Sequence, residues 1–295
     1  MIHLIPQGGL GNQMFQYAAA KACSLRLHTD LVIDLSFCEL HRNKSWCRSY
    51  ELDIFDLKTI ARNKSFKGRT MCRLKEMFEK LSWNQEKLLI FGLFADTCSF
   101  VYDCRFEQLK NGAMLLGYFQ NETYFKEYFK EIRQDFTFIH PLNEQNKIIA
   151  NNILSCQSVS LHIRRGDYLS DKGAAQTFAN LSLDYYRSAM EYMSRRVENP
   201  CFFVFTDDID WAKAQFHDPS ICFVDINKGK DSYNDMRLMS LCKHNIIANS
   251  SFSWWGAYLN SHSEKIVIAP ENWYQNQEQN ALAINNLLCN KWIQM

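Results

Sequence analysis

Two adjacent arginines at the end of a predicted strand are the residues of this chain whose types and spacing best suit chemistry. Residues 158–163 alternate apolar and polar side chains with the period of two that indicates a β-strand, and Arg164, Arg165, Gly166 and Asp167 follow directly. Neighbouring guanidinium groups repel each other, and each presents a planar fork that fits pairs of phosphate oxygens. Ligands of open α/β sheets bind at the carboxyl ends of strands, so this turn predicts a phosphate site. A solvated surface turn is the alternative interpretation.

Two other predicted strands also end in polar side chains. Residues 201–205 form a continuous apolar run, typical of a parallel strand covered on both faces, and Asp207 and Asp208 follow it. A third predicted strand, 245–248, leads into Asn249, Ser250 and Ser251. Hydroxyl groups and free amides at a helix start can accept a phosphate. Simple capping of the following helices is the alternative role for the serines and for the two aspartates.

One acidic residue in the second half is a candidate for recognising a base. Asp235 lies in a predicted helix, 233–242, just before the last of the polar strand ends. If that helix packs inward, its carboxylate could accept two hydrogen bonds from a guanine edge. Otherwise Asp235 is a solvated acid near Arg237.

A glycine-rich turn near the start of the chain could also face an anion. The segment from Gly8 to Gly11 lies between a predicted strand, 2–5, and a predicted helix, 14–27. The pattern is similar to a dinucleotide fingerprint with Asp34 as the ribose acid, but Met14 stands where the third glycine belongs, so the signal for a nicotinamide is weak. The polar pair Asn12 and Gln13 indicates contacts to a hydroxylated ligand instead.

The elements that must position these residues alternate regularly after residue 156, which predicts a doubly wound parallel sheet. Pro141 interrupts the pattern before that point, and we divide the chain into an N-terminal α/β domain, 1–150, and a C-terminal Rossmann-like domain, 151–295. Helices are expected in the first part at 71–81, 122–136 and 143–154. In the second part, strands are expected at 158–163, 201–205, 221–225, 245–248 and 265–269, and helices at 183–197, 211–216, 233–242, 252–260 and 277–288.

Composition limits the possible classes of protein. The chain has 295 residues, of which 47% are hydrophobic, enough to fill the cores of two domains. A formal net charge of +1 argues against a nucleic-acid surface. The eleven cysteines include no Cys-x-x-Cys pair, which argues against a zinc ribbon or a disulfide framework. With no apolar run long enough for a membrane span, we expect a soluble, cytoplasmic protein with at most peripheral contact to the inner membrane face.

Three stretches of the chain together resemble the three signatures of the α-1,2-fucosyltransferase family, glycosyltransferase family 11. They are residues 8–17, 162–168 and 249–258, and they occur in the family's order. With residues 205–208 the resemblance covers nearly the whole chain, and three motifs of this length are highly specific. The family usually carries Trp where Tyr258 stands.

The resemblance implies a GT-B-like enzyme with two Rossmann-like domains. It would transfer L-fucose with inversion from GDP-β-L-fucose to the 2-hydroxyl of a terminal β-galactoside, without a metal or another cofactor. Arg164 would pair with the β-phosphate, and His162 and Asp235 would hold the guanine. Ser251 and Phe252 would meet the phosphates, while Asn12 and its glycine neighbours would close over the donor. The complete donor-binding set expected is Gly9, Gly11, Asn12, Gln13, His162, Arg165, Asp207, Asp208, Asp235, Asn249, Ser250, Ser251 and Phe252.

The catalytic residues expected are Arg164 and Asp167. Arg164 would stabilise the negative charge that develops on the departing GDP. Asp167 is the first candidate for the general base that deprotonates the acceptor hydroxyl, because it leaves the same strand end; bracing the arginines is its alternative role. Two other functions remain open at this stage. One is a nicotinamide-dependent oxidoreductase that uses the N-terminal turn, and the other is a non-catalytic glycan-binding protein.

Overall fold

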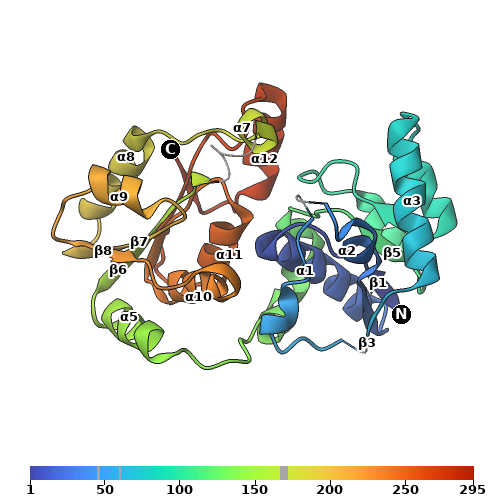
Figure 1. Cartoon of the computed structure of the whole chain (residues 1–295), viewed down its shortest axis with the longest axis horizontal. Helices are drawn as coiled ribbons and strands as arrows, with labels where there is room; N and C mark the ends of the chain where they lie inside the picture. The colour runs from blue at the N-terminus through green and yellow to red at the C-terminus, as the bar shows by residue number, and fades with distance from the viewer. Residues whose placement is uncertain (45–46, 60, 167–171) are drawn as a thin grey trace. The chain divides into compact units, whose positions relative to one another are not determined.

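In the computed structural model the chain folds into two compact units, Met1–His140 and Pro141–Met295 (Figure 1). The structure describes residues 1–44, 47–59, 61–166 and 172–295. Each unit contains a sheet whose strands pair in parallel. The expected α/β fold with two Rossmann-like halves is therefore confirmed.

The first unit is built on a five-stranded parallel sheet in the order β3-β2-β1-β5-β4. Helix α1 (Leu10–Arg26) packs against this sheet and against four short helices later in the unit, η1 (Leu52–Ile54), η4 (Glu122–Tyr124), η5 (Lys126–Tyr128) and α4 (Phe129–Asp135). Its many alanines allow close approach, and thirteen of its seventeen residues are buried. The strands are β1 (Ile2–Leu4), β2 (Leu31–Asp34), β3 (Ala61–Asn63), β4 (Leu93–Ala95) and β5 (Met114–Leu116).

The predicted helix 122–136 in this unit is only partly helical. It consists of two 3₁₀ turns followed by a short α4 (Phe129–Asp135). The buried Phe125, with φ −143°, leaves the helical region and separates the two turns. The two 3₁₀ turns are η4 (Glu122–Tyr124) and η5 (Lys126–Tyr128). The other helices described in the unit are α2 (Ser36–His41), α3 (Phe66–Lys80), η1 (Leu52–Ile54), η2 (Gln85–Phe91) and η3 (Cys104–Gln108).

The second unit contains a six-stranded parallel sheet in the order β11-β10-β9-β6-β7-β8. The central strands are β6 (Gln157–Ile163), β7 (Pro200–Thr206) and β9 (His244–Ile246), flanked by β8 (Ile221–Val224), β10 (Val267–Ala269) and β11 (Ile293–Gln294). The helices are α5 (Glu144–Ser155), α7 (Lys172–Thr177), α8 (Leu183–Ser194), α9 (Ile209–Gln215), η6 (Gly229–Asp231), α10 (Tyr233–Leu241), α11 (Ser251–Leu259) and α12 (Gln277–Leu287).

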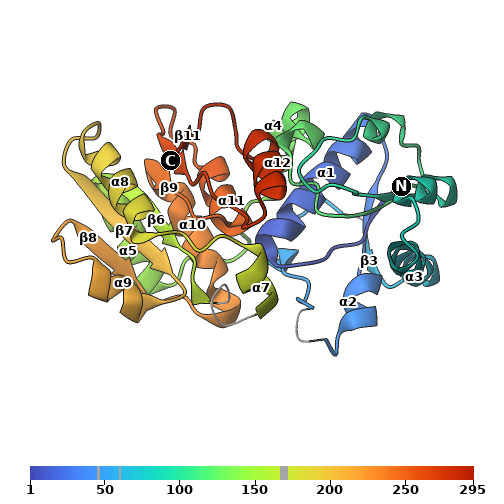
Figure 2. The same cartoon turned by 90° about the horizontal axis from the view of Figure 1, so that it is seen from above.

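Helices cover both faces of this second sheet (Figure 2). Phe202 and Val204 of β7 pack into the core formed with α8 and α9, whereas Phe203 and Phe205 pack into the core formed with α5, α10 and α11. The continuous apolar run of β7 follows from this two-sided burial. The doubly wound arrangement expected from the sequence is confirmed.

The division between the units falls before α5. The side chains of Asn146 in α5 and Asn227 exchange two hydrogen bonds, at 2.8 and 2.9 Å, and α5 packs against α10. Residue 150, where the sequence analysis divides the chain, therefore lies inside a helix of the second unit. Of the helices in the described ranges, none combines the length and the apolar character needed to cross a bilayer.

Candidate active site

The three polar strand ends of the second unit meet at one edge of its sheet. Strand β6 lies between β7 and β9, and all three run in parallel. Ile163 pairs with Thr206 and Leu161 pairs with Ile246, so the residues that follow each strand emerge close together. The predicted convergence at a carboxyl edge is therefore present.

Asp207, after β7, organises the arginine turn after β6. Its Oδ1 accepts hydrogen bonds from the backbone N–H groups of Arg165, at 2.9 Å, and Gly166, at 3.0 Å. Its Oδ2 lies 3.1 Å from a guanidinium nitrogen of Arg164. A Cβ on Gly166 would lie 3.2 Å from the carboxyl carbon of Asp207, so glycine permits this close approach. Asp207 thus acts first as a brace for the turn.

Arg165 is held by a different pair of groups. Its guanidinium carbon lies 3.9 Å from the centre of the Trp211 ring, a cation–π contact, and its Nε lies 3.5 Å from the Asp208 carboxylate. Asp208 also caps α9 by accepting from the Trp211 backbone N–H at 3.3 Å. Each arginine therefore has an acidic partner, so repulsion between the two does not by itself require an anionic ligand. Trp211 was not among the residues expected at this site; its place three residues after Asp208 is the signal that could have revealed it.

The third strand end is largely engaged in internal bonding. Asn249 is buried, and its side-chain amide donates to the carbonyl oxygens of Ala179, at 2.8 Å, and Trp273, at 3.0 Å. Both of its amide hydrogens thereby join two loops. The Ser250 hydroxyl accepts from the backbone N–H of Phe252 at 3.3 Å, which is the capping role weighed as an alternative. Ser251 begins α11 and is half-buried.

His162 and Asp235 both belong to elements that reach this edge. The His162 ring is buried, and its centre lies 5.8 Å from that of Phe252 in α11. Asp235 lies in the first turn of α10, and its Oδ1 accepts from the Asn227 side-chain amide at 2.8 Å. Burial, with a smaller contribution from the charge of Asp225, raises the pKa of Asp235 to about 7. Of the two alternatives for Asp235, the structure favours the inward-facing acid.

In the first unit, Gln13 is committed to the protein itself. Its buried side-chain amide donates to the carbonyl oxygens of Gly8 and Ser49, both at 2.7 Å, and its oxygen accepts from the backbone N–H of Glu51 at 2.9 Å. The hydrogen-bonding groups predicted to meet a hydroxylated ligand thus fix the segment around residue 50 onto α1. Asn12, one residue earlier, accepts from the Gln120 side-chain amide at 2.8 Å.

The start of α1 already carries a carboxylate. Glu51 Oε2 accepts from the backbone N–H of Leu10 at 2.8 Å, and burial raises the pKa of Glu51. Gly8, with φ +74°, makes the tight turn, Gly9 precedes the helix, and Gly11 is buried in its first turn. Glu51 gave no signal in the sequence, because its partner is forty-one residues away.

Asp34 cannot serve as a ribose acid. It is fully buried and accepts from the backbone N–H and hydroxyl of both Ser36 and Ser65. A Cβ on Gly68 would lie 2.3 Å from its Oδ2, so glycine is required where α3 crosses this carboxylate. The N-terminal turn lacks the accessible acid that the oxidoreductase hypothesis needs.

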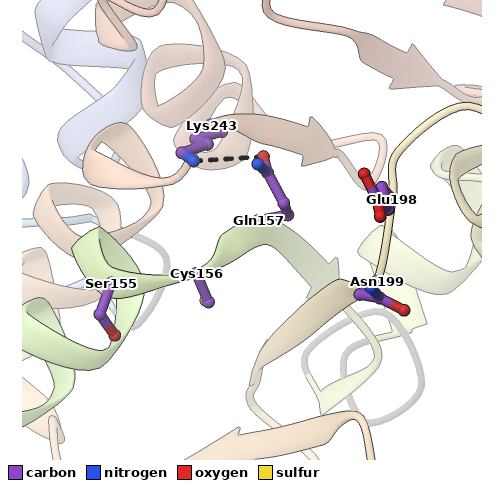
Figure 3. Close-up of a pocket in the computed structure, with 6 residues that line it drawn as sticks. All are labelled: Ser155, Cys156, Gln157, Glu198, Asn199 and Lys243. Atoms are coloured by element: carbon purple, nitrogen blue, oxygen red, sulfur yellow. Dashed lines mark hydrogen bonds between the residues drawn. The ribbon is translucent and has the colours of Figure 1, made fainter.

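Asp167, the expected base, lies outside the described residues. A shallow hollow at the opposite end of β6, near Cys156 and Asn199, is not this site (Figure 3). There Lys243 Nζ donates to Gln157 Oε1 at 3.2 Å. Within the part of the chain that the structure describes, no three His, Cys, Asp or Glu side chains are grouped so as to hold a metal.

Comparisons with known sequences identify close relatives along nearly the full length. The chain is 35% identical over 283 residues to an alpha-1,2-colitosyltransferase of Escherichia coli, covering 93% of this chain and 92% of the relative. It is 33% identical over 298 residues to the O-antigen biosynthesis glycosyltransferase WbnK of Escherichia coli, covering 95% and 97%. Human galactoside alpha-(1,2)-fucosyltransferase 1 is 27% identical over 159 residues, which is 49% of this chain and 42% of that protein.

The fold matches a solved glycosyltransferase structure. The fucosyltransferase NodZ from Bradyrhizobium aligns with a TM-score of 0.52 at 14% identity, covering 86% of this chain and 90% of that one, which supports the GT-B-like fold. The family model described as glycosyl transferase family 11 matches residues 104–295. Together with the near full-length relatives, this match shows that the chain belongs to glycosyl transferase family 11 and is a glycosyltransferase.

Proposed function

We propose that this enzyme transfers L-fucose from GDP-β-L-fucose to the 2-hydroxyl of a terminal β-galactoside, forming an α-1,2 linkage with inversion. The linkage is suggested by two relatives, the alpha-1,2-colitosyltransferase and the human galactoside alpha-(1,2)-fucosyltransferase 1. The guanine nucleotide is suggested by NodZ, an alpha-1,6-fucosyltransferase that was co-crystallized with GDP. The acceptor is an oligosaccharide or a lipid-linked glycan.

The observation that carries this proposal is the braced Arg164 at the carboxyl edge of the second sheet. Attack by a sugar hydroxyl leaves positive charge on the fucose ring and negative charge on the departing GDP. Arg164, held 3.1 Å from Asp207, can stabilise that negative charge without moving first. A fixed cation in this position can do what a divalent ion does in other transferases, so we propose that no metal is needed.

The guanine of the donor is recognised by Asp235 in α10. A guanine edge offers two N–H donors, and the ionised Asp235 carboxylate accepts both. Asn227 orients this carboxylate by donating to its Oδ1. His162, beside Phe252, contributes the second contact to the base. Ser251 and the backbone of Phe252, at the start of α11, meet the phosphates.

Asp167 is proposed as the general base for the acceptor hydroxyl. It follows the arginine turn by one residue, and a carboxylate there could take the proton as the new bond forms. We favour this role over bracing of the arginines, because Asp207 already pairs with Arg164 and Asp208 with Arg165.

A second donor sugar is favoured by one specific observation. The alpha-1,2-colitosyltransferase is 35% identical to this chain, and colitose is fucose without its 3-hydroxyl group. The deciding experiment measures GDP release from GDP-fucose and from GDP-colitose, in EDTA, with and without lactose. Lactose-dependent release from GDP-fucose supports the proposal and its metal independence. If only GDP-colitose is turned over, the donor is GDP-colitose and not GDP-fucose. GDP release that requires added Mg²⁺ or Mn²⁺ would refute the metal-free mechanism.

A further inference from the structure

Several large apolar side chains are exposed at one place in the first unit. This cluster spans the end of α3 and the segment that follows, which pack against each other (Figure 1). The exposed fraction of its apolar members runs from 42% at Met77 to 82% at Ile90. We call these residues, with the cations described next, the apolar-basic surface; the apolar ones are Met77, Leu81, Trp83, Ile90 and Phe91.

Three exposed cations lie in the same two elements. Arg73, Met77, Lys80 and Leu81 recur at helical spacings of three and four residues, so they share one side of α3, and Lys87 lies in the neighbouring η2. Among the described residues, neither the two α3 cations nor Lys87 forms an ion pair.

The nearby acids do not neutralise these cations. Glu79 pairs with Lys75, and Glu76 accepts from His41. Glu86 lies 3.4 Å from Arg105, whose guanidinium also pairs with Asp103. Among the described residues, the three cations beside the apolar side chains therefore have no acid as an ion-pair partner.

The segment that carries these apolar side chains packs on the buried core of the first unit. The Trp83 ring meets the buried Phe78 edge-on, with centroids 5.1 Å apart, and the Trp83 backbone N–H donates to the Phe78 carbonyl oxygen. Leu88 of η2 is fully buried in the same core. The exposed side chains thus project from a packed base.

We propose that this surface docks onto an anionic lipid membrane. A half-exposed Trp with neighbouring aliphatic side chains suits the interface between headgroups and acyl chains. Unpaired Arg and Lys suit the phosphates of acidic headgroups, which can move to meet all three cations. A free anion would leave the apolar side chains unexplained, and a protein partner would need acids at three fixed positions. This property goes beyond the proposed glycosyl transfer and does not depend on it.

The test is sedimentation of the full chain with vesicles made of equal parts phosphatidylglycerol and phosphatidylcholine. We expect binding to these vesicles, little binding to pure phosphatidylcholine, and weakening by high NaCl, since headgroup attraction is screened. The combined variant Met77→Ser, Leu81→Ser, Ile90→Ser should bind about tenfold more weakly or worse, because it removes three insertable side chains. The combined variant Arg73→Gln, Lys80→Gln, Lys87→Gln should lose most of the salt dependence.

The matched control removes comparable apolar side chains elsewhere. Ile148 and Leu154 of α5 are 60% and 61% exposed, and the pair Ile148→Ser, Leu154→Ser should bind vesicles as the wild type does. All these positions are exposed, so unchanged melting temperatures are expected and serve as the folding check. No binding to the anionic vesicles, or equal loss in the control pair, would overturn the proposal. So would a concentration-dependent dimer that only the Met77, Leu81, Ile90 variant abolishes, since the surface would then join two copies.

Discussion

The carboxylate of Asp207 lies 3.1 Å from the guanidinium of Arg164 and also binds the next two backbone amides, those of Arg165 and Gly166. One side chain directly after β7 therefore sets both the path of the turn after β6 and the position of the Arg164 guanidinium. Such an arginine loses little conformational freedom when a phosphate binds, because its position is already fixed. The relation predicts different consequences for changes at the two residues.

Replacing Arg164 with Ala should lower kcat/KM by about 100-fold or more, which corresponds to about 3 kcal/mol of lost transition-state stabilisation. The measurement is the initial rate of GDP release with lactose as acceptor. Arg195→Ala is the control, since that arginine is exposed just after α8 and pairs with Glu191, one helical turn earlier. An Arg164→Ala enzyme with wild-type kcat/KM would remove Arg164 from the mechanism.

Replacing Asp207 with Asn should lower kcat by roughly tenfold or more while changing the KM for GDP-fucose much less. The amide oxygen can still accept from the backbone of the turn, but the charge that orients Arg164 is gone. Asp208→Asn is the comparison and should cost less, since Trp211 still supports Arg165. A rise in KM with unchanged kcat would mean instead that Asp207 contacts the donor directly.

The fold could be predicted because its signals are local. The alternation in β6, the apolar run of β7 and the helix pattern of α10 each fall within one element, and the order of these elements specifies a parallel sheet. The carboxyl-edge position of Arg164 and Asp207 follows from that order alone. The prediction of one continuous helix at 122–136 was wrong. Phe125 is buried in the core with a non-helical φ, so its burial outweighed the local preference for helix.

The roles of several polar residues could not be predicted, because their partners are distant in sequence. Gln13 bonds to a segment near residue 50, and Asn249 bonds to the loops at Ala179 and Trp273. In a sequence, a polar residue in a motif looks the same whether it faces a ligand or satisfies a buried backbone group. Direct donor contacts by Asn249, Ser251 and Phe252 therefore stay predictions.

Binding of the donor should depend on the protonation state of Asp235. Its pKa is raised from 3.8 to about 7, chiefly by burial, and only the ionised form accepts both guanine donors. The KM for GDP-fucose should therefore rise as the pH falls below about 7, by about tenfold per pH unit. In Asp235→Asn the KM should be high and flat over the same range. A wild-type KM that stays constant down to about pH 5 would contradict this role.

Stability provides a second readout for Asp235 that needs no substrate. Because the folded pKa lies above the unfolded value of 3.8, the folded state binds more protons between these two values. The stability contributed by this group is thus present at low pH and is lost as the pH rises through about 7. Relative to wild type, Asp235→Asn should be more stable at about pH 8 than at about pH 5 in urea unfolding. An equal stability difference between the variant and wild type at both pH values would show that the pKa of the Asp235 carboxyl is not raised in the folded protein.

Gln13 distinguishes a structural role from donor contact most clearly. Gln13→Leu keeps a side chain of similar size but deletes three part-buried hydrogen bonds, so the Gly8 and Ser49 carbonyls and the Glu51 N–H lose their Gln13 partner. We expect a loss of about 3 kcal/mol in the free energy of unfolding, with the KM for GDP-fucose changed little at temperatures where the protein is folded. Gln134→Leu, at an exposed position of α4, is the control and should leave stability nearly unchanged. If Gln13→Leu instead unfolds like the wild type and raises the KM, Gln13 contacts the donor, as its place in the glycine-rich motif first suggested.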